Sequence, residues 1–178
     1  NKETLVNEMQ CSFDYIKNGL WSEDNVYTSL KNGLLNVHYR DYMFRKFIDL
    51  SFDEQVDFTD NYIDFVEALI DDSSVDDNAT NNFVTIEIGL ITILLGNIEK
   101  NNIDVPEIIV AAFEHASNEL HEAIGNSDAE IPTLFRLFQQ VQRYNIPPTV
   151  FYDSVENVSE QQILDTYEEF NSNADTTD

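Results

Sequence analysis

The sequence feature that most constrains the fold is the apolar run at residues 83–98, "FVTIEIGLITILLGNI", in which Glu87 is the only charged residue. Its β-branched residues would suit a strand, but sixteen residues without a turn signal favour a helix. A helix that is apolar nearly all round must be covered on every side. We therefore expect this run to form the buried centre of the molecule.

Helical periodicity extends along most of the remaining chain. Apolar residues recur at helical spacing in these segments: 3–17, 22–37, 39–50, 52–70, 105–124, 132–144 and 159–170. Weak helix formers at Gly33 and Asn36 predict a break between the second and third segments. Residues 71–82 are typical of a polar loop.

These patterns predict an all-α fold. We expect a single domain over residues 1–170, because no stretch rich in Gly, Pro or Ser divides the chain. It should contain about seven or eight helices, arranged as an irregular bundle or as stacked helix pairs. Residues 171–178 contain no apolar side chain larger than that of Ala174, so a disordered acidic tail is predicted there.

The charge of the chain is unevenly distributed. The formal net charge is −25, yet residues 1–46 contain six acids and six bases and are neutral. Residues 47–178 contain 28 acids against three bases and therefore carry the whole net charge. Such a surface disfavours direct binding to nucleic acid or to an anionic membrane, and it favours a basic partner.

Part of this charge forms a stripe on the predicted helix at 52–70. A capping-box pattern, Ser51 with Glu54, predicts where that helix starts. Six acids lie within about 80° of one another on a helical wheel, and they define the acidic stripe: Asp53, Asp57, Asp60, Asp64, Glu67 and Asp71. Apolar residues cover the opposite half, so we predict a helix buried on one face, with a candidate partner-binding stripe on the other.

One basic and aromatic cluster lies in the neutral part of the chain. It contains Arg40, Asp41, Arg45 and Lys46 among aromatic side chains. Contact with a nucleic acid or an acidic partner is one interpretation. In so acidic a chain, internal ion pairing that fixes the packing of the anionic helices is the interpretation we favour.

No group of residues identifies a reaction. Cys11 with one of the three histidines lacks the surroundings of an activated nucleophile. His115, Glu119 and Glu122 share a helix face, but the spacing of known zinc and di-iron motifs is absent. The acids at 71–77 lack the ligand spacing of an EF-hand loop. We predict that the protein is not an enzyme and has no cofactor and no metal.

The sequence also bears on the cellular compartment. A single cysteine cannot form an intrachain disulfide, which fits a reducing compartment. The start has no pattern typical of a signal peptide, and no apolar run reaches the about 20 residues that span a bilayer. We expect a cytoplasmic protein, and the oligomeric state stays open.

Two segments resemble a known family. These are "SEDNVYTSLKNGLLNVHYRDYMFRKFID", with the Arg40-Asp41 pair, and a later part that contains "LLGN", "IIVAAFEHASNEL" and "LFRLFQQVQRYNIPPTVF". They are similar to the actinobacterial domain of unknown function 4192 family over residues 22 to about 158. The resemblance implies a helical architecture and an actinobacterial or actinophage origin. The family has no established reaction to transfer.

Together the sequence predicts a non-catalytic domain that binds a basic protein through its acidic surface. An inhibitor that imitates DNA and blocks a nucleic-acid-binding protein, encoded by a phage or mobile element, is one form of this function. The stripe repeats a charge about every 5 Å, against about 1.7 Å along duplex DNA, so other acids would have to lie beside it. The alternatives are a helical scaffold that binds through an apolar groove, with acids that serve only solubility, and an enzyme or metal protein with an unrecognised site.

Overall fold

The computed structural model describes residues 2–104 and 148–166, and every regular element in these ranges is a helix. The predicted all-α class is therefore confirmed. The elements are α1 (Lys2–Lys17), α2 (Asp24–Gly33), α3 (Val37–Ile48), α4 (Phe52–Ile70), α5 (Asp77–Asn101) and α8 (Pro148–Glu156). A short helical segment also covers residues 160–166. The helices predicted at 105–124 and 132–144, and the predicted tail at 171–178, lie outside the described residues.

Helix α5 is the centre of the described structure, as the apolar run predicted. Nearly all of its side chains from Phe83 to Ile98 are buried. The helix begins before the apolar run, because the Asp76 side chain accepts a hydrogen bond from the Ala79 backbone N–H at 2.8 Å and caps the first turn. The loop predicted at 71–82 is thus wrong in its second half.

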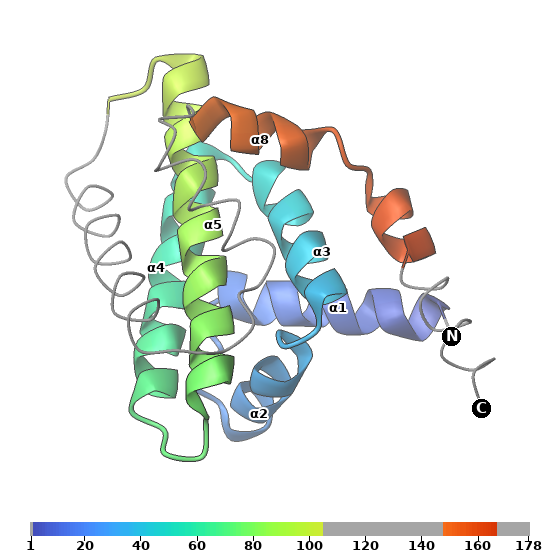
Figure 1. The fold of residues 1–178 in the computed structure, drawn as a ribbon, viewed down its shortest axis with the longest axis vertical. Coiled ribbons are helices and arrows are strands. Elements are labelled where there is room, and N and C mark those ends of the chain that lie inside the picture. The colour runs from blue at the N-terminus through green and yellow to red at the C-terminus, as the bar shows by residue number, and fades with distance from the viewer. Residues whose placement is uncertain (1, 105–147, 167–178) are drawn as a thin grey trace.

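The other helices pack around α5 (Figure 1). α4 runs alongside α5, α8 crosses its C-terminal half, and α3 contacts both α5 and α8. α1 lies across the group and contacts α2, α3 and α4. At the crossing of α5 and α8, a Cβ added to Gly96 would lie 2.8 Å from the Tyr152 Cβ and 3.0 Å from the Pro148 carbonyl oxygen. The close approach of these two helices therefore requires glycine at this position.

The core is rich in aromatic side chains. Phe65 of α4 is fully buried, and its ring packs against Trp21, Tyr27, Tyr62 and Phe83 with centroid distances from 5.8 to 6.1 Å. These rings join α2, α4 and α5 with the turn after α1. A smaller cluster contains Met9, Tyr42, Ile163 and Leu164, and it docks the segment 160–166 against α1 and α3.

The break predicted near Asn36 is present. α2 ends at Gly33, and the Asn36 side chain caps α3 by accepting the His38 backbone N–H at 2.8 Å. The predicted start of α2 is wrong by one residue, since Glu23 and not Ser22 holds the N-cap position. The Glu23 side chain makes no capping hydrogen bond, so the position of this start is not fixed by a cap.

Helix α8 was not predicted. Its first residue is Pro148, the second of two consecutive prolines that follow the helix predicted at 132–144. Proline is favoured at the first position of a helix because its fixed φ suits the helix and its missing N–H is not needed there. Pro148 is therefore consistent with a helix start, but prolines are also common in loops, so the proline alone did not predict α8.

Helix α5 also has the length and composition of a membrane span. Residues 78–101 form 24 residues of helix, longer than the apolar run that the sequence suggested, and an 18-residue window within them has a mean hydropathy of 1.4. In the structure, 76% of this window is buried by the rest of the chain. The apolar surface of α5 is therefore used as core.

Candidate functional site

The candidate site is the acidic stripe, and the structure builds it on the exposed face of α4. The predicted capping box is present: the Ser51 hydroxyl accepts the Glu54 N–H at 3.3 Å, and the Glu54 carboxylate accepts the Ser51 N–H at 3.2 Å. This cap fixes where α4 begins and so fixes its register. The register in turn directs the aromatic side chains inward and the carboxylates outward.

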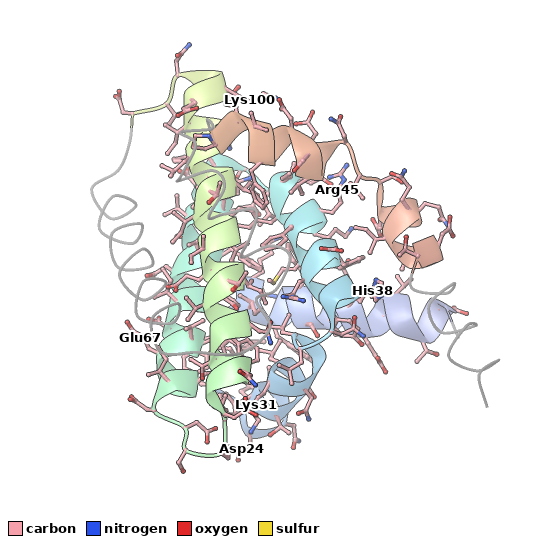
Figure 2. All side chains as sticks on the ribbon, in the orientation of Figure 1. Asp24, Lys31, His38, Arg45, Glu67 and Lys100 are labelled. Atoms are coloured by element: carbon pink, nitrogen blue, oxygen red, sulfur yellow. The ribbon has the colours of Figure 1, made fainter. Side chains whose placement is uncertain are left out.

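All six stripe residues are exposed. From Asp53 to Asp71 they extend about 27 Å along the helix axis. Glu67 lies on the outer side of α4, away from α3 (Figure 2). The structure therefore brings the six predicted residues together on one solvent-facing surface.

None of the six stripe carboxylates forms an ion pair or side-chain hydrogen bond with any described residue. Five cations form ion pairs with acids outside the stripe. In four of these pairs the N–O distances are 3.3 Å from Lys17 to Glu54, 3.8 Å from Lys31 to Asp72, 3.1 Å from Arg45 to Asp49 and 3.6 Å from Lys46 to Glu160. Lys100 pairs with Asp153 at 2.5 Å and lies 4.0 Å from Glu156. Lys31 and Lys100 lie at opposite ends of the molecule (Figure 2). The stripe is thus a set of charges that the described part of the fold leaves uncompensated.

Two carboxylates show how differently these acids are held. Partial burial, together with the charge of Asp60, raises the pKa of Asp64 within the stripe. Just beyond the stripe, hydrogen bonds from Ser74 and from the Tyr27 hydroxyl at 2.7 Å lower the pKa of Asp72 to about 2. Asp72 belongs to the acids at 71–77 that were weighed as calcium ligands. Its oxygens already hold α2 and the turn after α4 together.

Of the described acids that could widen the stripe, Asp104 is exposed, whereas three in the C-terminal segments pair with lysines. Asp153 and Glu156 of α8 surround Lys100, and Glu160 pairs with Lys46 of α3. The acids at 107–130 and at 168 and 169 lie outside the described residues. A second row of carboxylates beside the stripe is therefore still a prediction.

The basic and aromatic cluster is divided by α3 into a surface part and a buried part. Arg45 and Lys46 form the ion pairs given above, and the Lys46 ammonium also lies 5.8 Å from the centre of the Tyr42 ring. Arg40 is buried, at 7% exposure, and its Nε and Nη1 atoms have no hydrogen-bond partner among the described residues. Burial raises the pKa of the neighbouring Asp41 to about 6, although the Arg40 charge opposes that rise.

Sequence reasoning missed the polar groups that are buried on α4 and α5. Glu87 of α5 and the hydroxyl of Tyr62 of α4 are both fully buried. Desolvation raises the pKa of Tyr62, the Glu87 charge raises it further, and the Arg40 charge opposes this. The available signal was Glu87 itself, the one charge in an apolar run, which predicts a buried partner of opposite sign.

The residues considered for catalysis or metal binding form no site among those described. Cys11 is exposed on α1, whereas His38 is buried at the start of α3. No group of three or more His, Cys, Asp or Glu side chains in residues 2–104 and 148–166 is arranged to hold a metal ion. His115, Glu119, His121 and Glu122 lie outside these ranges.

Comparison of the chain with protein-family models, with curated proteins and with solved structures finds no match. The resemblance to the actinobacterial domain of unknown function 4192 family therefore stays a prediction, as does the origin that it implies.

Proposed function

We propose that the protein acts without catalysis, by binding a basic protein through the acidic stripe on α4. The observation that carries this proposal is a contrast in pairing: five cations each contact an acid outside the stripe, whereas the six stripe carboxylates contact no cation among the described residues. The five cations are Lys17, Lys31, Arg45, Lys46 and Lys100. A face of six uncompensated charges about 27 Å long suits a partner with lysines or arginines at matching spacing. If the protein imitates DNA, further acids must lie beside the stripe, because the stripe alone carries fewer charges per unit length than duplex DNA.

The test compares two variants with the same net charge. The stripe variant carries Asp57→Asn, Asp60→Asn, Asp64→Asn and Glu67→Gln. The control variant carries Glu23→Gln, Asp24→Asn, Glu99→Gln and Asp104→Asn, four exposed acids outside the stripe. Removing four negative charges takes both from −25 to −21.

The probe is a synthetic helical peptide with lysines at the i, i+4 and i, i+7 spacing of the stripe, measured by fluorescence anisotropy across a salt series. We expect the stripe variant to bind about tenfold more weakly at low salt, because four surface ion pairs of a few tenths of a kcal/mol each are lost. The control variant should change much less, and high salt should remove the difference. Equal losses in the two variants would show that only net charge matters, and the proposal would be wrong.

A further inference from the structure

A groove of about 680 Å³ lies where α1 faces the C-terminal half of α2 and the start of α3. Its volume is within the range of about 300 to 1,000 Å³ that small-molecule sites occupy in proteins. The groove belongs to the neutral part of the chain and does not include the acidic stripe. It therefore represents a second surface, independent of the proposed function.

The lining of this groove is almost free of charge. Of its eleven lining residues, only Glu8 is an acid and none is Lys or Arg. The Glu8 carboxylate already accepts a hydrogen bond from the Tyr39 hydroxyl at 2.6 Å. An anionic ligand would find no cation here and would be repelled by the net charge of the chain. The chemistry of the lining therefore selects a neutral polar ligand.

Neutral polar groups face this groove with unused hydrogen-bonding capacity. The amides of Asn7 and Asn32 and the hydroxyls of Ser12 and Ser29 line it, and none of them forms a side-chain hydrogen bond with a described residue. Each amide has two donors and an acceptor, and each hydroxyl both donates and accepts. These side chains are suited to a ligand that is rich in hydroxyl groups, because a hydroxyl also both donates and accepts hydrogen bonds.

An aromatic ring is fixed in the groove wall. A Cβ added to Gly33 would lie 3.0 Å from Cε2 of Tyr39, so glycine at this position lets the Tyr39 ring pack closely against the end of α2. The bond to Glu8 holds the other end of the same side chain. The Tyr15 ring, half-buried, is also part of the lining. The groove thus offers rigid apolar surface beside its amides and hydroxyls.

We propose that this groove binds a neutral oligosaccharide. A sugar unit has hydroxyls that donate and accept, which suit Asn7, Asn32 and the serines, and an apolar C–H face that suits a tyrosine ring. A peptide main chain fits less well, because extended peptides pair with the edge of a sheet. The walls of this groove are helices, whose interior main-chain groups are already hydrogen-bonded.

Cys11 provides a built-in reporter for the test. It is the only cysteine of the chain, it is exposed, and it lines the groove. The rate of its alkylation by iodoacetamide is measured alone and with millimolar maltotriose, cellotriose or chitotriose. We expect at least one of these neutral sugars to slow the reaction at least twofold, and a sulfated trisaccharide to leave it unchanged. Unfolded protein should show no protection, which excludes an effect of the sugar on the reagent.

Matched variants locate the binding. Asn7→Ala with Asn32→Ala should abolish the protection, whereas Asn25→Ala, on α2 but outside the lining, should leave it intact. Amide chemical shifts of the unaltered protein give a second readout, independent of any folding defect in a variant: sugar should move resonances of groove residues. Absence of both protection and shifts with every neutral sugar would overturn the proposal, as would protection by a neutral tetrapeptide and by no sugar. Neither result would affect the binding assigned to the stripe.

Discussion

The two faces of α4 carry opposite chemistry on the same nineteen-residue helix. On one face, Phe58, Tyr62, Phe65 and Leu69 are fully buried against the neighbouring helices. On the other, the six acids of the stripe are all exposed. Both faces contain polar groups. Those on the buried face are hydrogen-bonded to other helices or to the main chain, whereas those of the stripe have no such partner among the described residues.

Polar groups on the buried face are all engaged. Gln55 donates to the Phe47 carbonyl oxygen at 3.0 Å and accepts from the Asn97 amide at 2.9 Å, so it joins α3 to α5. Thr59 donates to the Gln55 carbonyl, and the Tyr62 hydroxyl donates to the Phe83 carbonyl, both at 2.8 Å. The stripe has no such contacts with the described residues. The buried face therefore determines stability, and the stripe can change without loss of the fold.

The largest expected effect is at the centre of the buried face. Phe65→Ala should lower the free energy of unfolding by about 3 to 5 kcal/mol, because it removes a ring packed against four others and leaves a cavity. Chemical denaturation measures this change. The neighbouring substitution Asp64→Ala, on the exposed face, should change stability by less than about 0.5 kcal/mol. Similar losses in the two variants would contradict the division of α4 into two faces.

A smaller effect is expected at Gln55. Gln55→Leu fills similar space but leaves the buried Asn97 amide without the acceptor it uses, which should cost about 1 to 3 kcal/mol. The double variant Gln55→Leu with Asn97→Leu should recover part of the loss, because no amide is then left unbonded. A double variant whose loss of stability equals the sum of the two single losses would show that the hydrogen bond between Gln55 and Asn97 contributes nothing.

The cap of α4 should contribute less again. Ser51→Ala removes the acceptor for the Glu54 N–H and should cost about 1 kcal/mol. Ser51→Asp retains an acceptor at the same position and should cost much less. Thermal unfolding of the two variants separates the cap from any general effect of this surface position.

The smallest effect on stability is expected on the stripe. The fourfold stripe variant should unfold with the same free energy as the parent chain or gain a few tenths of a kcal/mol, because it relieves repulsion between acids three and four residues apart. The pKa of Asp64 is raised in the folded state, so the folded protein binds a proton at Asp64 more tightly than the unfolded chain does. The Asp64 contribution to the stability of the parent therefore increases as the pH falls from 7 toward the ordinary pKa of a carboxyl group, and the variant should lose this pH dependence. Denaturation at several pH values measures both. A loss above about 1 kcal/mol would show that the stripe supports the fold.

Much of the fold followed from local patterns. The capping box at Ser51, the break at Asn36 and the buried run at 83–98 are all present in the structure. Each depends on side chains within a few residues of one another, so the sequence alone contains the cause. The prediction that apolar residues of the helix at 52–70 form its buried face is wrong at Ile70, which is 48% exposed in the last turn of α4.

The acidic stripe illustrates what the sequence by itself determined. Helical periodicity places six acids on one face whatever surrounds the helix, because 3.6 residues per turn is a local property. Whether that face points to solvent, and whether the lysines of distant segments reach it, are decided only by tertiary packing. The lysines at 17, 31, 46 and 100 contact acids outside the stripe. The burial of Arg40 and Glu87, and the neutral groove between α1 and α2, likewise depend on helix contacts between residues that are distant in the chain. No local pattern contains them.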